Sequence, residues 1–457
     1  MFARRLGAAG LLLLAGCTAN RPFRTDYTVT GPGAPNSPGA VIESTRDYKL
    51  GFVEFDDQGW FWDPRQWKAA TAMIGEGAGL NSPSGGPGAV IVLFVHGWKN
   101  NASADNSNVQ MFRDTLTQLN KFELAESAQE KRQARRVVGV YAGWRGLSAT
   151  AEPFKEFSFY ERKNTAHKVG HGGLTELLVR LESLQRQINR HPVRGTAGTP
   201  SANRDTELII MGHSFGGGAV YTAISQILLQ RFVDSVDEGR VLQSFGDLVI
   251  LLNPAFEASI HQQLDVLATG ARYTTAQKPV MAIFTSESDW ATKYAFPVGR
   301  SLSTWWEKYR DSGQGTADRE TVGNFAPFLT HDLRYVAGLQ LPPAPTAVAA
   351  LPGAAPAAAP VPPPSGGGGA EAAASVAHLH TMRARWHANA TPTFVTQKPE
   401  PYSFTEARLE PRPNYPAGDP FLIVTVDQTI MNGHDDIENP RLIKFLDEFI
   451  VFCRPER

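Results

Sequence analysis

The chain has 457 residues, of which 42% are hydrophobic, so it can bury a sizeable core and disorder as its general state is excluded. Lys and Arg number 44 and Asp and Glu 45, and the resulting net charge of −1 argues against a nucleic-acid-binding protein, because those usually carry a basic excess. Two cysteines cannot form a disulfide framework or a cysteine-rich metal site.

Residues 1–16 have the pattern of a secretory signal peptide. A basic start is followed by a short apolar run, Leu6 to Leu14, which is well below the roughly 20 apolar residues that span a bilayer. The residues Leu14-Ala15-Gly16-Cys17 resemble the lipobox of bacterial lipoproteins. The resemblance implies that Cys17 is lipidated and anchors the protein to a membrane of the bacterial cell envelope, and the non-acidic Thr18 implies the outer membrane. An ordinary signal peptide that ends near a cysteine is the alternative.

Residues 17–45 are rich in Pro, Gly, Ser, Thr and Asn and lack apolar periodicity, which predicts a lipidated tether. We expect the folded domain to cover residues 46–457. Near its start, Asp57-Gln58-Gly59 lies between two apolar stretches, Leu50 to Phe55 and Trp60 to Trp62, which predicts an antiparallel N-terminal hairpin. Near its end, Cys453 lies among aromatic and aliphatic residues, which favours a buried structural thiol.

Strands and helices alternate over the rest of the chain. Short, nearly continuous apolar runs predict buried parallel strands at Ala89 to Val95, Val137 to Tyr141, Leu208 to Met211, Leu248 to Leu252, Val280 to Phe284 and Phe421 to Val426. Apolar residues at helical spacing predict helices over Leu174 to Ile188 and Ala219 to Leu228, and a last helix that starts with Asn439 as N-cap and Pro440 as first residue. This alternation predicts an α/β fold with a doubly wound, mostly parallel sheet.

One segment breaks the alternation. Residues 341–375 are almost entirely Pro, Ala and Gly, a composition that predicts a disordered or extended insert before the last strand. Because candidate catalytic residues lie on both sides of it, we expect an insertion within one catalytic domain rather than a linker between two.

The strongest motif is Gly212-His213-Ser214-Phe215-Gly216. It follows a predicted strand and precedes a predicted helix, which is the context of a nucleophile elbow. Such a turn holds Ser214 in a strained backbone, and small residues two positions before and after it let the strand and helix approach each other. The free amide of Phe215 at the helix N-terminus would face a developing oxyanion. The motif therefore predicts Ser214 as a nucleophile.

With these residues, the chain resembles the serine hydrolases of the α/β-hydrolase superfamily from about Ala89 to its C-terminus. The resemblance implies the α/β-hydrolase fold and a second oxyanion amide in the loop after an early strand. Here Val95-His96-Gly97-Trp98 closes such a strand, so the amide of Trp98 is the candidate. His96 precedes the nucleophile, which indicates a structural role.

The chain order of the superfamily is Ser, then acid, then His. His434 lies just past the final predicted strand, where the superfamily places its base. The competing histidines, none of which directly follows a predicted strand, are His331, His378, His380 and His387. His378-Leu379-His380 also suggests a metal, but two histidines without neighbouring Cys or carboxylates usually belong to a solvated segment, so no metal site is predicted.

The acid is open between three carboxylates. Asp289 follows the predicted strand Val280 to Phe284 and matches the usual placement, where it would hold the tautomer of the base. Glu287 lies two residues before it. Glu257 follows the preceding strand, a position that some members of the superfamily use.

These residues predict a serine hydrolase that cleaves carboxylic esters through an acyl-enzyme, without metal or organic cofactor. Peptidase or acyltransferase activity uses the same triad, and an inactive lipid-anchored scaffold on a hydrolase fold is the alternative from another class. Aromatic residues that follow successive strands would form an apolar substrate wall favouring uncharged esters, namely Trp98, Trp144, Phe215, Phe256 and Trp290. These rings could instead pack beneath loops, and Lys99 and Arg145 beside two of them could select an anionic group.

Overall fold

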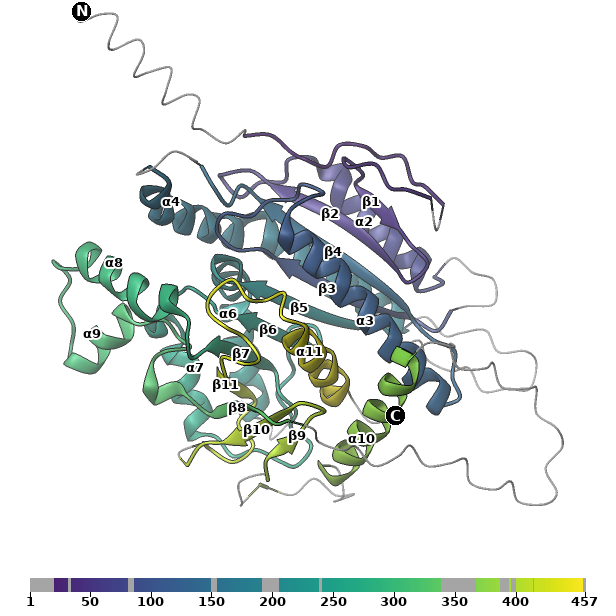
Figure 1. Ribbon diagram of the computed structural model, residues 1–457. Helices are drawn as coiled ribbons and strands as arrows, with labels where there is room; N and C mark the ends of the chain where they lie inside the picture. The colour runs from purple at the N-terminus through teal and green to yellow at the C-terminus, as the bar shows by residue number, and fades with distance from the viewer. Residues whose placement is uncertain are drawn as a thin grey trace, which may run out of the picture.

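The computed structural model describes residues 20–31, 34–80, 86–148, 154–190, 205–237, 241–337, 367–386, 394–395, 400–413 and 415–454. Over these residues the chain builds one mixed sheet of eleven strands in the order β1-β2-β4-β3-β5-β6-β7-β11-β8-β10-β9 (Figure 1). The strands are β1 (Ile42–Ser44), β2 (Tyr48–Phe55), β3 (Ala89–Val95), β4 (Arg136–Trp144), β5 (Glu207–His213), β6 (Leu248–Leu252), β7 (Met281–Ser286), β8 (His331–Tyr335), β9 (Tyr402–Ser403), β10 (Ala407–Pro411) and β11 (Phe421–Val426).

The helices follow the strands along the chain. They are α2 (Pro64–Gly77), α3 (Ser107–Gln129), α4 (Phe154–Val169), α5 (Thr175–Arg190), α6 (Phe215–Asp237), α7 (Ala258–Gly270), α8 (Phe296–Ser303), α9 (Ser312–Arg319), α10 (Gly367–Trp386) and α11 (Pro440–Cys453), with the π turns η1 (Gly170–Leu174) and η2 (Ala291–Ala295) and the 3-10 turn η3 (Ala326–Phe328). No helix in the described part of the chain is long and apolar enough to cross a membrane.

The sheet is buried on both faces, which explains the continuous apolar runs of its central strands. Along β3, Ile91 and Leu93 face one core and Val92 and Phe94 face the other, because successive side chains of a strand point to opposite sides. Helices α2, α4, α5, α6 and α7 cover the first face, and α3, α10 and α11 cover the second (Figure 1). The structure is therefore an α/β protein with helices on both faces of a mostly parallel sheet.

The seven pairings from β2 to β8 are parallel, and only the two edges of the sheet are antiparallel. From β3 the chain continues into β4 on one side, and it later places β5 on the other side of β3. In open α/β sheets a ligand crevice forms where the strand order reverses in this way, at the carboxyl ends of the strands. The loops after β3 and β5 therefore border the position at which a site is expected.

The six predicted strands are confirmed as β3, β4, β5, β6, β7 and β11, with shifts of a few residues at some ends. The last helix is confirmed at its first residue, since Asn439 accepts a hydrogen bond from the amide of Arg441 and Pro440 opens α11. These elements carry local signals, a β-branched apolar run or a cap, that do not depend on distant contacts.

The predicted hairpin at Asp57-Gln58-Gly59 is present as a short antiparallel turn, in which Phe55 bridges Phe61 and the amide of Trp62 donates to the carbonyl of Glu54 (2.9 Å). A second antiparallel pairing, which was not predicted, joins β1 to β2 through residues 45–47. The predicted tether is wrong for the described residues between 20 and 45. Arg24 is 1% exposed there and donates hydrogen bonds to the carbonyls of Ala40 and Ala102. Its polar side chain is therefore hydrogen-bonded to the protein rather than to solvent.

The predicted insert is corrected at its C-terminal end. Its residues 341–366 lie outside the described residues, but from Gly367 onward the segment forms α10. Ala is the best helix former, so the Ala-rich part becomes helical once Ala372, Ser375 and Val376 are buried against the second core. The low-complexity composition therefore did not predict that a packed helix begins within this segment.

Candidate active site

Ser214 lies in the turn between β5 and α6 with a backbone φ of 55°, a left-handed conformation that residues other than glycine rarely adopt. Its amide donates to the carbonyl of Leu252 (3.0 Å), and its own carbonyl accepts from the amide of Ala255 (3.1 Å). Both partners belong to the end of β6 and the loop behind it. The neighbouring strand therefore holds the strained turn in place.

Two glycines allow the backbones around Ser214 to approach closely. A Cβ on Gly216 would lie 2.2 Å from the carbonyl oxygen of Val95, and a Cβ on Gly97 would lie 2.7 Å from the Cβ of Ser214. Only glycine fits at such distances. The loop after β3 therefore passes directly against the turn that carries Ser214.

Three predicted residues come together around this turn. The Nε2 atom of His434 lies 2.7 Å from the Oγ of Ser214, and its Nδ1 atom lies 2.8 Å from the Oδ2 of Asp289. Asp289 is fully buried and also accepts hydrogen bonds from the amide (3.1 Å) and hydroxyl (2.6 Å) of Thr292. The hydroxyl, the imidazole and the carboxylate thus form one continuous hydrogen-bonded relay.

The electrostatics of the relay fit a neutral hydroxyl beside a base with a buried counter-ion. Burial lowers the pKa of His434, but the hydrogen bond and negative charge of Asp289 raise this pKa by a larger amount, so the net pKa lies above the ordinary value. Burial likewise raises the pKa of Asp289, and the bonds to His434 and Thr292 outweigh it, so the net pKa of this carboxyl is lowered. Asp289 is therefore ionised beside the imidazole and fixes Nδ1 as the protonated nitrogen.

Sequence reasoning missed the residues that hold the His434 loop. Asn253, which follows β6 with a φ of 42°, donates from Nδ2 to the carbonyls of Gly433 (3.0 Å) and His434 (2.9 Å). Its Oδ1 accepts from the amide of Ser286 (2.9 Å). The Nε2 of His213 also donates to the His434 carbonyl (2.9 Å). The only available signal was that Asn253 directly follows a predicted strand.

The loop after β3 is fixed beside the relay. The amide of Lys99, a residue with a φ of 69°, donates to the carbonyl of Gly146 (3.0 Å), and the amide of Gly146 donates to the carbonyl of Asn100 (3.0 Å). His96 is a structural residue, as predicted. Its Nδ1 donates to the carbonyl of Gly97 (2.9 Å) and its Nε2 accepts from the amide of Trp144 (3.0 Å), while burial lowers its pKa to about 4.

The two alternative acids have other partners. Glu257 forms an ion pair with Lys163 and one of 2.9 Å with Arg300. Glu287 accepts from the amide of Gln428 (3.2 Å) and pairs with Arg334 (3.4 Å). Of the three carboxylates, Asp289 is the one bonded to His434.

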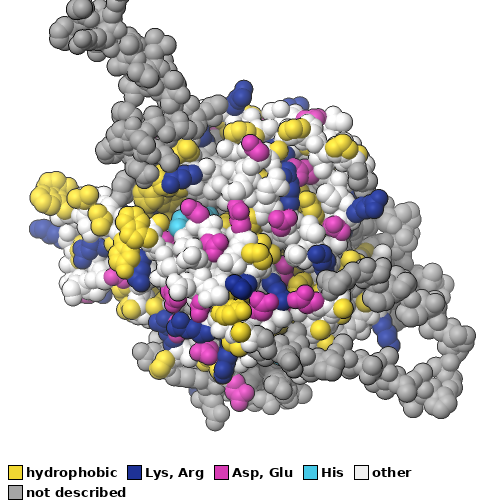
Figure 2. Space-filling model, viewed as in Figure 1, with side chains coloured by type: hydrophobic (Ala, Val, Ile, Leu, Met, Phe, Trp, Pro, Cys, Tyr) yellow, Lys and Arg dark blue, Asp and Glu magenta, His cyan; other side chains and the backbone are white. Residues whose placement is uncertain are grey.

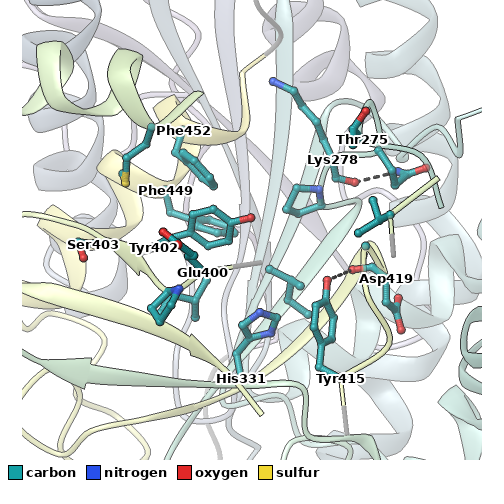
Figure 3. A pocket seen from close by; sticks show the side chains of 18 of the residues that line it. Thr275, Lys278, His331, Glu400, Tyr402, Ser403, Tyr415, Asp419, Phe449 and Phe452 are labelled. Atoms are coloured by element: carbon teal, nitrogen blue, oxygen red, sulfur yellow. Dashed lines mark hydrogen bonds between the residues drawn. The ribbon is translucent and has the colours of Figure 1, made fainter. Parts of the chain in front are cut away.

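The competing histidines lie elsewhere. His331 is buried on β8, where burial lowers its pKa to about 3, and it lines a cavity of about 530 Å³ (Figure 3). Tyr415 and Asp419 line the same cavity at the amino end of β11 (Figure 3), whereas the relay lies at the carboxyl ends of the strands. His378 and His380 lie on α10, and His387 lies outside the described residues.

His380, Glu126 and Glu130 could together face a cation, as could His213, His434 and Asp435. In the first group, Glu126 already pairs with Arg132, Arg383 and Arg454. In the second group, His213 and His434 take part in the bonds described above. Glu126, His213 and His434 are therefore already bonded to other groups of the protein.

The predicted aromatic wall is corrected in part. Trp144 is 3% exposed, and Phe215 and Phe256 are each 1% exposed, so these three rings are buried in the core instead of facing a substrate. Trp144 stacks on His96 and Phe256 on Tyr221. Near Ser214, the ring of Phe159 on α4 lies 5.3 Å from the ring of Trp98 and 4.7 Å from that of Phe215, which forms an apolar group on one side of the relay.

The charged neighbours and the remaining predicted groups also have definite places. Arg145 pairs with Asp57. The ammonium of Lys99 lies 4.1 Å from the centre of the Trp98 ring. Trp290 is 67% exposed. Cys453 is half-buried on α11, where burial raises the pKa of its thiol to about 12, and Cys17 lies outside the described residues.

No protein-family model matches this chain, and no curated protein matches it either. Its function must therefore be inferred from the chemistry of the site itself.

Proposed function

We propose that this protein is a serine hydrolase of the α/β-hydrolase fold that cleaves carboxylic esters. The observation that carries the proposal is the relay from Ser214 through His434 to Asp289, with a serine in a left-handed turn between a strand and a helix. A serine hydroxyl is a weak nucleophile unless a base accepts its proton, and a base of fixed tautomer lies 2.7 Å away.

In the proposed reaction, the Oγ of Ser214 attacks the ester carbonyl while the Nε2 of His434 takes its proton. The tetrahedral oxyanion is stabilised by the amides of Phe215, at the N-terminus of α6, and Trp98, in the loop that Gly97 brings against Ser214. The intermediate collapses as His434 returns the proton to the departing alcohol. Water, activated by the same imidazole, then releases the acid from the acyl-enzyme. Asp289 stabilises the imidazolium that forms in both steps.

The substrate class follows from the neighbours of the hydroxyl. Trp98 and Phe159, which are partly exposed, form an apolar group there with the buried ring of Phe215 behind Phe159, and this group favours an uncharged aliphatic or aromatic acyl chain. A series of p-nitrophenyl esters from acetyl to longer acyl chains, with one acidic ester, tests this class. We expect kcat/KM to rise over the first methylenes, each contributing up to about 0.8 kcal/mol. A preference for the acidic ester would instead point to Lys99.

We further propose that Cys17 is lipidated and that the protein faces its substrate from a bacterial membrane, in keeping with the lipobox-like Leu14-Ala15-Gly16-Cys17. Metabolic labelling with a clickable fatty acid tests the anchor. Labelling that persists in Cys17→Ser would contradict it.

Reaction with a fluorophosphonate probe, followed by peptide mapping, tests the hydrolase. We expect the probe on Ser214, and we expect Ser214→Ala to lose both labelling and several orders of magnitude of esterase turnover. A wild-type chain that neither labels nor turns over any ester, amide or acyl-transfer substrate would favour the inactive scaffold. Labelling retained in Ser214→Ala would identify another nucleophile.

A further inference from the structure

The segment after Asp289 carries a row of exposed apolar side chains. Trp290, Tyr294, Val298 and Leu302 follow one another at intervals of four along η2 and α8, and they are 67%, 53%, 63% and 78% exposed. Residues at this spacing share one side of a helix. Trp305 and Trp306 follow directly and are 71% and 79% exposed. We call these six residues the α8 apolar face.

The opposite side of the same segment is fixed to the body of the protein. Phe296 and Gly299 are buried, and Arg300 is bonded to Asp318 (2.8 Å) and Glu257 (2.9 Å). The helix is therefore held in place while its outer side has aromatic rings in solvent. Contiguous exposed apolar surface of this kind usually marks a binding surface. Figure 2 shows hydrophobic side chains gathered at the end of the molecule where α8 lies, with Lys and Arg side chains beside them.

The face has the composition of a membrane-interface segment. Trp and Tyr, which have an apolar body and a polar tip, are typical of the headgroup level of bilayers. Residues 290–311 also contain four cations, Lys293, Arg300, Lys308 and Arg310, and two anions, Glu307 and Asp311, in a protein of net charge −1. Arg300 is held by Asp318 and Glu257, and Arg310 pairs with Asp311 (3.0 Å), so Lys293 and Lys308 are the cations that remain for an external anion. Such a local basic excess complements the negative charge of anionic phospholipids.

The first described residues lie at the carboxyl edge of the parallel sheet, which is also the edge that carries the α8 apolar face. The amide of Phe23 donates to Glu54 (2.9 Å), near the carboxyl end of β2, and the Nε of Arg24 donates to the carbonyl of Ala102 (2.6 Å), in the loop after β3. The α8 apolar face follows the carboxyl end of β7, and β2, β3 and β7 belong to the parallel part of the sheet. Cys17 precedes Phe23 by only six residues. A lipid on Cys17 would therefore place this edge next to the membrane.

We propose that the α8 apolar face binds the surface of a phospholipid bilayer containing anionic lipid. The rings of Trp290, Trp305 and Trp306 lie at the headgroup level, and the ammonium groups of Lys293 and Lys308 contact phosphates. The face is a second attachment besides the proposed anchor, and one anchor alone gives only weak membrane binding. The proposal adds to the proposed function, because it brings Ser214 to esters held in the bilayer, but binding itself does not require catalysis.

Co-sedimentation of the full chain with vesicles tests the proposal in a Cys17→Ser background, which removes the anchor. We expect binding to vesicles of phosphatidylcholine with phosphatidylglycerol, weaker binding to phosphatidylcholine alone, and weakening by salt. The double substitution Trp305→Ser and Trp306→Ser should lower the affinity at least about tenfold, since two large apolar side chains no longer enter the interface. The matched control is Val233→Ser with Val266→Ser, two exposed residues near the C-terminal ends of α6 and α7.

The N-terminal residues are the same in all these variants, so the difference between the two double variants reports on the α8 apolar face. Equal vesicle binding by the tryptophan variant and the control would overturn the proposal. A dimer in solution that only the tryptophan variant abolishes, without vesicle binding by the wild type, would overturn it in favour of a second copy of this chain. Unchanged vesicle binding in Ser214→Ala would support it, and would separate its outcome from that of the proposed hydrolase.

Discussion

Charged side chains are buried at both edges of the parallel sheet, but they are partnered in different ways. At the carboxyl edge, Asp289 has one charged partner, His434, whose other nitrogen faces a hydroxyl. At the amino edge, Glu123, Glu126 and Glu207 lie among the guanidinium groups of Arg132, Arg135, Arg383 and Arg454. Buried charges are stable only when they are paired and hydrogen-bonded, and both edges meet this condition.

The two edges differ in whether the pairing of the buried charges leaves a group that can exchange a proton. Arg135 bonds to Glu123 (2.7 Å) and Glu207 (2.6 Å), and Arg454 bonds to Glu207 (2.9 Å), so the carboxylates of the amino edge face cations from several elements. Burial raises the pKa of Glu123, but Arg454 and Arg135 outweigh it and lower the net value to about 2. The carboxyl edge instead ends in a polarised base next to a strained serine. One arrangement fixes the structure, and the other is suited to moving a proton.

The largest expected effect comes from breaking the carboxyl-edge pair. Asp289→Asn should lower kcat by about 10⁴-fold, because an amide no longer fixes the tautomer or stabilises the imidazolium. Steady-state kinetics with a p-nitrophenyl ester measures this. Glu257→Gln is the matched control and should change kcat by less than about tenfold, since Glu257 pairs with Lys163 and Arg300 rather than with His434. A greater loss in Glu257→Gln would move the acid to the loop after β6.

The same variant has a pH signature. In the wild type, kcat/KM should fall about tenfold per unit as the pH drops below the pKa of His434, because the protonated imidazole cannot accept a proton. Asp289 is the group that holds this pKa above the ordinary value of about 6.5. In Asp289→Asn the inflection should therefore move to lower pH. A profile with an unchanged inflection would mean that another group controls the protonation of the base.

Breaking the amino-edge cluster should affect stability instead of chemistry. Arg454→Met leaves Glu207 and Glu126 without one buried cation and should lower the free energy of unfolding by about 3–5 kcal/mol. Urea unfolding measures this, and kcat/KM of the folded variant should stay within about twofold of the wild type. Arg180→Met on α5 removes an exposed arginine that pairs with Glu176 and should change stability by less than about 1 kcal/mol.

Acid denaturation measures how much the amino-edge cluster contributes to stability. The folded pKa of Glu123 is lowered to about 2, so its contribution to stability is present above its unfolded pKa and is lost as the pH falls through the folded value. Arg454→Met should reduce the difference between the stability at neutral pH and at pH about 3, because the cation that lowers this pKa is gone. An equal acid sensitivity in both proteins would show that the cluster does not control it.

A smaller effect is expected from the residue that positions the base. Asn253→Ala removes the hydrogen bonds to the carbonyls of Gly433 and His434 and should lower kcat by about 10²-fold with little change in KM, because a shift of the imidazole by a fraction of an ångström misaligns proton transfer. Fluorophosphonate labelling should slow by a similar factor. Asn253→Asp keeps the size of the side chain but not its donors, so recovery of kcat in that variant would argue against the positioning role.

The two edges also differ in how well sequence predicts them. The strands, Ser214 and His434 could be predicted from the sequence, and the acid could be limited to Asp289, Glu287 and Glu257, because these residues follow buried apolar strands and parallel strands bring their carboxyl ends together. Asn253 also directly follows a predicted strand, but its role could not be predicted, since it depends on a loop 180 residues further along the chain. The amino-edge cluster was equally unpredictable, because its members come from α3, the loop between α3 and β4, β5, α10 and the end of α11.

The failures have a common physical origin. The composition of residues 17–45 and 341–375 predicted solvent-exposed segments without a fixed fold. Tertiary contacts, however, determine whether such a segment is ordered. Arg24 is buried by bonds to Ala40, Ala102 and Glu43, and Ala372 is buried on α10. Likewise, Trp144 and Phe256 follow strands as a substrate wall would require, yet their rings turn into the core. Position along a strand predicts the edge on which a residue lies, but not whether its side chain faces solvent.

The smallest expected effect comes from replacing the low-complexity segment that precedes α10. Residues 341–366 lie outside the described residues, whereas α10 supplies Arg383 to the amino-edge cluster. Replacing 341–366 by a Gly/Ser linker should change the free energy of unfolding by less than about 1 kcal/mol, since loop-closure entropy varies only slowly with length, and should leave esterase activity intact. Extending the replacement to residue 375 removes the first turns of α10, including buried Ala372 and Ser375, and should destabilise the protein by several times that amount. Unfolding by the shorter replacement, or an active fragment ending near Gln340, would contradict the single catalytic domain, because His434 and α11 lie beyond this segment and complete both the relay and the second core.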